Sequence, residues 1–134
     1  MKKRSKRLLI LVMALCALVL LSGCMKYSSS YKAGTLMNSN SHTSPFMEFS
    51  TFSGTMAYQL NTGNAATAKI EAKASLAGGS AKVWYDDGTK KELFSISGGE
   101  EVEETYGPFE SNTVYIIVES AGEMTGGSFH FTVK

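Results

Sequence analysis

Strict alternation of apolar and polar residues over nine positions most restricts what this chain can fold into. Every second residue from Ala68 to Leu76 is apolar, and Lys69, Glu71, Lys73 and Ser75 stand between them. A period of two sends successive side chains to opposite faces of an extended strand. Alanine and lysine favour helix by propensity. Because the charges fall on every second residue, the pattern predicts a β-strand.

Similar patterns recur through residues 46–134. Alternation or runs of β-branched residues predict further strands at 55–60, 80–86, 90–97, 100–106, 113–120 and 128–133. Asp87-Gly88 supplies the positive φ of a tight hairpin, so residues 80–86 and 90–97 should pair antiparallel. The apolar run at 113–120 predicts a central strand covered on both sides, and residues 122–127 read as a loop. Seven or eight short strands without a convincing helix predict an all-β fold, an antiparallel, jelly-roll-like β-sandwich.

Three segments of the sandwich resemble the pre-peptidase C-terminal domains of secreted bacterial peptidases. They are the Tyr-Asp-Asp-Gly hairpin at 85–88, the Tyr-Ile-Ile-Val-Glu strand at 115–119 and the Gly-Ser-Phe-His-Phe-Thr-Val ending at 127–133. The resemblance implies a small extracellular jelly roll. No peptidase module precedes it, so the peptidase setting does not carry over.

The first 21 residues have the layout of a secretory signal. Residues 1–7 contain five cations, and residues 8–21 form an uncharged apolar run. That run has only fourteen residues, whereas a transmembrane helix needs about 20. The pattern therefore predicts export rather than a permanent membrane span.

The apolar run ends in Leu21-Ser22-Gly23-Cys24, which resembles the lipobox of bacterial lipoproteins. The resemblance implies cleavage between Gly23 and Cys24, with a thioether-linked diacylglycerol on Cys24 as a membrane anchor. A two-chain anchor holds firmly because each buried methylene adds about 0.8 kcal/mol. The protein would then lie on the outer face of the cell membrane, or on the outer membrane of a two-membrane cell. An ordinary cleaved signal with a chance cysteine remains the alternative.

These signals divide the chain into three parts: a cleaved signal peptide at 1–23, a flexible tether at 24–45 and a β-sandwich domain at 46–134. The tether is predicted because Ser, Asn, Thr and Gly dominate it and no period persists. Extended, it would lift the domain several tens of Å off the membrane. A short edge strand at 34–37 is the alternative.

Processing also changes the charge and the cysteine count. The mature chain keeps eight Lys, no Arg and all twelve acidic residues, a net charge of −4. This balance argues against a nucleic-acid partner, which needs a basic surface. Cys16 is lost with the signal and Cys24 is lipidated, so no disulfide can form.

The mature chain offers little for catalysis. Its two histidines are His42, in the expected tether, and His130, which alternation places on the face opposite Phe129 and Phe131. A hydrolase would need a serine and an acid to converge on His130. Paired His or Cys ligands for zinc are absent, and no cofactor is expected.

The acidic residues allow two interpretations. Carboxylates cluster at Glu100, Glu101, Glu103 and Glu104, and Asp86 and Asp87 share a turn. Calcium prefers such oxygen ligands, but no Asp-x-Asp-x-Asp-Gly loop is present. A charged edge strand that resists pairing with other chains is the favoured interpretation.

Trp84 is the candidate ligand-binding residue. Alternation with Val83 and Tyr85 places it outward, where an aromatic ring can stack on a sugar or fill a partner's pocket; burial in the core is the alternative. The sequence therefore predicts a non-enzymatic cell-envelope lipoprotein, a binding or surface-assembly module with a protein or glycan partner. The alternatives are a carbohydrate-binding module using Trp84 and a hydrolase.

Overall fold

The structure is a computed structural model that describes residues 26–134. These residues form nine β-strands and no helix, so none of them could span a bilayer as a helix. The strands are β1 (Ser30–Ala33), β2 (Leu36–Ser39), β3 (Phe46–Asn61), β4 (Ile70–Gly78), β5 (Ser80–Asp86), β6 (Lys90–Ser97), β7 (Glu101–Tyr106), β8 (Thr113–Ser120) and β9 (Met124–Val133). The predicted signal peptide, the predicted cleavage site between Gly23 and Cys24, and Cys24 itself lie outside the described residues.

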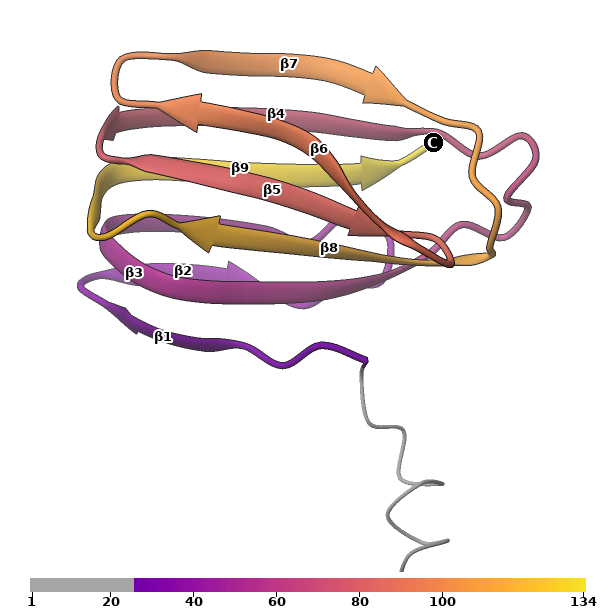
Figure 1. Cartoon of the computed structure of the whole chain (residues 1–134), viewed down its shortest axis with the longest axis horizontal. Coiled ribbons are helices and arrows are strands. Elements are labelled where there is room, and N and C mark those ends of the chain that lie inside the picture. The colour runs from indigo at the N-terminus through magenta and orange to yellow at the C-terminus, as the bar shows by residue number, and fades with distance from the viewer. Residues whose placement is uncertain (1–25) are drawn as a thin grey trace, which may run out of the picture.

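The strands form two layers that share β3. A hydrogen-bonded path runs β6-β5-β8-β3-β9-β4-β7, and β1 and β2 also pair with β3. The first part of β3, residues 46–52, pairs with β9, whereas residues 55–61 pair with β8. All these pairs are antiparallel. Figure 1 shows β5, β6 and β8 in front of β4 and β9, the arrangement of a sandwich.

Gly54 makes the crossover of β3 possible. Its φ is +123°, a conformation that L-residues rarely adopt, and a Cβ there would overlap the Ser30 carbonyl oxygen. The chain can therefore leave one layer and enter the other without interrupting the strand, while β1 packs closely against the bend.

The core fills the space between the two layers. Its largest fully buried side chains are Tyr58, Phe52, Phe129, Phe131, Met47, Met56, Leu60, Ile70, Ile96, Ile116, Met124 and Val83. Burial of each such side chain contributes about 1.5–3 kcal/mol. Because residues 26–134 contain no cysteine, this packing and the strand hydrogen bonds hold the described sandwich together.

The predicted fold class, an all-β jelly-roll-like sandwich, is confirmed. Seven strands lie in residues 46–134, and β5, β6 and β8 begin and end at the predicted residues. The central position of β8 is also confirmed, because Ile116 and Ile117 are both buried although they point to opposite faces. Other boundaries were wrong: β3 begins at Phe46 instead of residue 55, β4 spans 70–78 instead of 68–76, and residues 124–127, predicted as loop, belong to β9. Its Thr125 and Gly127 pair with both β3 and β4, an arrangement that local turn propensity does not reveal.

The structure differs from the predicted flexible tether over residues 30–39. These residues form β1 and β2, which pair with β3, and the alternative of a short edge strand near 34–37 agrees with β2. Tyr58 Oη adds a bond of 2.6 Å to Asn38 Oδ1. Both strands are mostly exposed, so they lack the alternation that reveals a half-buried strand.

Candidate functional site

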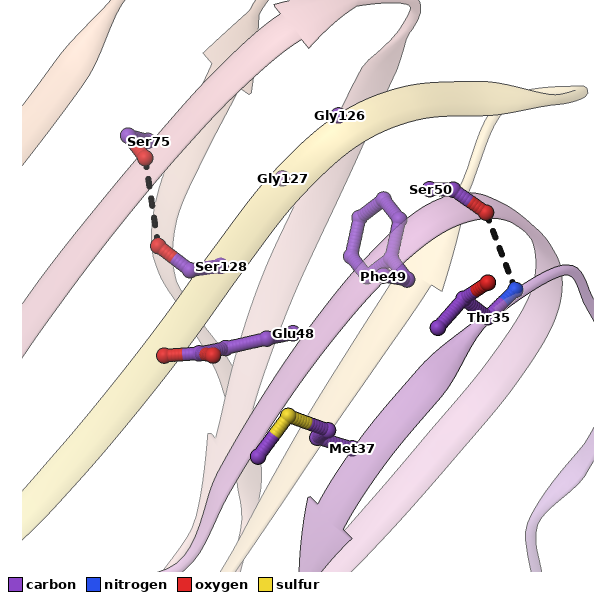
Figure 2. Close-up of a pocket in the computed structure, with 9 residues that line it drawn as sticks. All are labelled: Thr35, Met37, Glu48, Phe49, Ser50, Ser75, Gly126, Gly127 and Ser128. Atoms are coloured by element: carbon purple, nitrogen blue, oxygen red, sulfur yellow. Dashed lines mark hydrogen bonds between the residues drawn. The ribbon is translucent and has the colours of Figure 1, made fainter.

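An open groove crosses the outer face of β2, β3, β9 and β4. It encloses about 560 Å³ and is lined by Thr35, Met37, Glu48, Phe49, Ser50, Ser75, Gly126, Gly127 and Ser128 (Figure 2). We call these nine residues the sheet-face groove. Its volume lies in the range of ligand sites, roughly 300–1,000 Å³.

Glycines form the floor of the groove between the side chains of β3 and β4. A Cβ on Gly127 would lie 2.6 Å from Phe49 Cζ and 3.0 Å from Leu76 Cδ1, which is too close for a real side chain. Glycine therefore lets the Phe49 ring pack beneath β9. Gly126, whose Cβ would instead lie 3.2 Å from the Cβ of exposed Ala77, leaves that position of β9 without a side chain on the outer face, so a ligand can approach the backbone there.

The walls of the groove carry hydroxyl groups, a carboxylate and an exposed apolar side chain. The Ser75 and Ser128 hydroxyls lie 3.1 Å apart across β4 and β9, and Ser50 Oγ accepts a 2.9 Å bond from the Thr35 amide (Figure 2). Met37 is 59% exposed. The groove can therefore offer hydrogen bonds and an apolar contact to the same ligand.

His130 adjoins the groove through Glu48. His130 Nε2 lies 3.0 Å from Glu48 Oε1, and its ring stacks on Phe46 at 5.2 Å between centroids. Phe129 and Phe131 are buried, which confirms that His130 faces the opposite side of β9. The pair places a polar cluster at one margin of the groove.

The hydrolase alternative gains no support from this geometry. Within residues 26–134, the hydrogen bond of the His130 ring goes to Glu48, and none joins it to a serine. His42 Nδ1 lies 2.9 Å from the Gln59 carbonyl oxygen. A general base must reach its nucleophile within about 2.6–3.2 Å or through one water, so neither histidine is paired as a triad requires.

Trp84 lies on the outer face of β5 and is half-buried, while its neighbour Val83 is fully buried. The predicted outward direction is therefore correct. Lys90 Nζ lies 4.8 Å and Lys82 Nζ 5.4 Å from the ring centre. These lysines restrict access to the ring. Ligand binding by Trp84 therefore stays a prediction. Within the described residues, its buried Nε1 has no hydrogen-bond partner.

Asp86 lies on the same outer face as Trp84 and holds the N-terminal segment against the sheet. Its Oδ2 accepts bonds of 2.8 Å from Lys26 Nζ and 2.7 Å from Tyr27 Oη, and its Oδ1 accepts a 2.8 Å bond from the Gly88 amide. The Tyr27 ring packs edge-on against Tyr115, with centroids 5.6 Å apart. We call Lys26, Tyr27 and Asp86 the Asp86 clasp.

Electrostatics favour the charged form of the clasp. The hydrogen bond from Lys26, followed by that from Tyr27, lowers the pKa of the Asp86 carboxyl from 3.8 to about 2. The same bond to Asp86 raises the pKa of the Lys26 amine above its ordinary value. The clasp therefore stays ionised at neutral pH, although the Asp86 side chain is only 2% exposed.

The acidic residues of β7 lie along the edge of the sheet, where β7 pairs with β4. Glu101 and Glu103 are exposed, and Glu103 Oε1 lies 3.7 Å from Lys73 Nζ. The turn carboxylate Asp87 instead accepts a 2.9 Å bond from the Glu110 amide. In the part of the chain that the structure describes, no three His, Cys, Asp or Glu side chains gather as a metal site. This geometry agrees with the edge-strand interpretation.

Sequence reasoning missed the groove and the clasp. Alternation does place Ser75 and Ser128 on the polar faces of their strands, but it does not indicate that β4 and β9 are neighbours. Asp86 and Lys26 are separated by 60 positions, and no local pattern links them. Both sites depend on strand pairing.

The described architecture is that of a β-sandwich, and comparison with solved structures gives the same class. The chain is similar to TmCBM61, solved in complex with β-1,4-galactotriose, at 12% identity and a TM-score of 0.50, over 79% of this chain and 87% of that one. It is also similar to CBM29-2, a family 29 carbohydrate-binding module, at 14% identity and a TM-score of 0.40, over 84% of each chain. Protein NMB1881 from Neisseria meningitidis shows 15% identity and a TM-score of 0.37, over 74% of this chain and 85% of that one. No protein-family model and no curated protein matches the sequence.

Proposed function

We propose that this chain is an exported cell-envelope lipoprotein, anchored through Cys24, whose non-enzymatic sandwich binds a glycan in the sheet-face groove. The lipobox pattern supports the anchor. The lining of the groove carries the proposal of glycan binding, because it joins several hydroxyls, one carboxylate and an exposed Met37 on an open sheet face.

Sugars match this lining chemically. A pyranose presents hydroxyls around its rim and C–H groups on its faces, so it needs hydrogen-bond partners beside an apolar contact. Ser75, Ser128 and Glu48 provide partners from three neighbouring strands, and Met37 provides the apolar contact. The groove is open, so it suits a segment of an extended chain. The shared fold with TmCBM61, which was solved with β-1,4-galactotriose, supports the same class of ligand.

The Trp84 face is a second candidate for glycan or protein binding. Trp84 is half-buried and directed outward, and a movement of Lys82 and Lys90 would uncover its ring. Trp84 is the only tryptophan of the chain and does not line the groove. Its fluorescence therefore distinguishes the two surfaces.

Titration calorimetry with β-1,4-galactotriose and a panel of other oligosaccharides, followed in parallel by tryptophan fluorescence, tests the proposal. Glu48→Gln replaces a hydrogen bond to a charged group, worth about 1.5–3 kcal/mol, with a neutral one, worth about 0.5–1.5 kcal/mol, so it should weaken binding roughly 5-fold to 10-fold. Trp84→Ala is the matched control and should leave the affinity unchanged. If Trp84→Ala weakens binding and Glu48→Gln does not, the site lies at Trp84 instead. Titrations that release or absorb no heat with any of the sugars would refute glycan binding.

A further inference from the structure

The Asp86 clasp fixes the start of the described chain to one end of the sandwich. Asp86 is the last residue of β5, where the chain turns into β6. The C-terminus lies at the same end, on the right in Figure 1, and the β4–β5, β6–β7 and β8–β9 hairpins lie at the opposite end. We call these the clasp end and the far end.

The clasp leaves little chain between the sandwich and Cys24. Cys24 precedes Lys26 by two residues, and extended chain spans at most about 3.6 Å per residue, so Cys24 lies within roughly 7 Å of Lys26. A free tether over residues 24–45 would instead reach roughly 70 Å. A lipid on Cys24 would therefore hold the clasp end close to the membrane surface.

Charge differs between the two ends. The clasp end carries most of the mature chain's lysines, namely Lys26, Lys69, Lys90, Lys91 and Lys134. Acids at the same end, Glu71, Asp86, Asp87, Glu92 and Glu110, offset these lysines: Glu71 Oε2 lies 2.9 Å from Lys134 Nζ, Asp86 is held in the clasp, and Asp87 Oδ1 lies 3.6 Å from Lys91 Nζ. The far end carries the exposed acids Glu100, Glu101, Glu119 and Glu123 against one lysine, Lys32 of β1, so it is the more acidic of the two ends. Anionic headgroups therefore repel the far end more strongly than the clasp end within about a Debye length, roughly 8 Å.

We infer that the sandwich sits on an anionic bilayer in one orientation, with the clasp end against the lipid headgroups and the far end directed away. The inference rests on the lipid anchor of the proposed function. Along β5, Ser80 lies about 20 Å from Asp86. The groove lies toward the far end, where Thr35 and Gly126 line it, and on the layer opposite the clasp. The orientation therefore leaves the groove open to a polymer above the membrane.

Two single-cysteine probes test the orientation in the full lipidated chain. Thr89→Cys labels the β5–β6 hairpin and Glu123→Cys labels the β8–β9 hairpin, and both positions are exposed. Each labelled protein is reconstituted into vesicles of phosphatidylglycerol and phosphatidylethanolamine that contain lipids with a nitroxide on the headgroup. The fluorophore at position 89 should be quenched severalfold more than the fluorophore at position 123.

Releasing the clasp should remove the difference. With Asp86→Ala, or with Tyr27→Ala in case the first variant folds poorly, the two probes should be quenched almost equally. Equal quenching with an intact clasp, in protein whose mass shows diacylglycerol on Cys24, would overturn the orientation but leave the anchor standing. An unmodified Cys24 would overturn the anchor and this inference together, while glycan binding would be tested separately.

Discussion

Replacing Asp86 with asparagine should destabilise the sandwich in a way that depends on pH. The substitution keeps an acceptor for the Gly88 amide but removes the charge that Lys26 and Tyr27 share. A hydrogen bond to a charged group contributes about 1.5–3 kcal/mol, against about 0.5–1.5 kcal/mol for a neutral one. The bond to Lys26 adds little, because the lysine side chain is 53% exposed and solvent screens its charge.

These contributions give an expected loss of about 1–2 kcal/mol at pH 7 for Asp86→Asn. For a domain of this size the loss corresponds to a fall in Tm of roughly 4–8 °C. Urea and thermal unfolding of residues 24–134, carrying Cys24→Ser to avoid lipidation, measure it. Glu92→Gln is the matched control, because Glu92 is an exposed acid on the adjacent strand, and it should change stability by less than about 0.5 kcal/mol.

The pH dependence follows from the lowered pKa of Asp86. A carboxylate whose pKa is depressed in the folded state stabilises that state above its unfolded pKa. The stabilisation should therefore be complete above about pH 4 and disappear as the pH falls toward 2. The Asp86→Asn protein lacks this titration, so the two unfolding curves should converge in acid. A difference in stability that is unchanged between pH 7 and pH 2 would refute the argument.

Two further substitutions test other parts of the chain. Cys24→Ala should leave an unlipidated precursor in cells fed with labelled fatty acid, and normal lipid incorporation would contradict the lipobox prediction. Tyr58→Phe should lower the free energy of unfolding by about 1 kcal/mol, because Tyr58 Oη donates to Asn38 Oδ1 at 2.6 Å and to the Phe46 carbonyl oxygen at 3.1 Å. Urea unfolding measures this loss, and an unchanged midpoint would show that water replaces both bonds without cost.

Local pattern predicted those strands whose faces differ in polarity or whose ends carry turn residues. Residues 80–86 and 90–97 satisfy both conditions, since they flank Asp87-Gly88 and alternate where they pack on the core. Pattern failed where hydrogen bonding holds a strand without much burial, as in β1 and β2. It also failed at residues 124–127, whose composition indicates a turn: Thr125 and Gly127 pair with both β3 and β4, while Gly126 between them has a φ of +53°.

The sites were less predictable than the fold, because each joins residues that only the tertiary structure brings together. Alternation correctly directed Trp84 and His130 outward. It carried no information about Lys90 above the Trp84 ring or about Glu48 beside His130, which lies 82 positions away in the sequence. The contacts of Asp86 with Lys26 and Tyr27 could not be predicted either, because the sequence predicts a flexible tether over residues 24–45.

The position of β9 within its sheet has a consequence for when the chain can fold during synthesis. β9 is the last strand along the chain, yet it lies between β3 and β4, and its register joins Phe46–Phe52 to Ile70–Gly78. A nascent chain that has not yet delivered residues 124–133 therefore cannot close that layer, and the apolar faces of both strands stay uncovered. Contacts between residues so far apart in sequence also form slowly. The order of the strands thus delays folding until synthesis is nearly complete, which would suit the export proposed above, because an exported chain crosses the membrane unfolded.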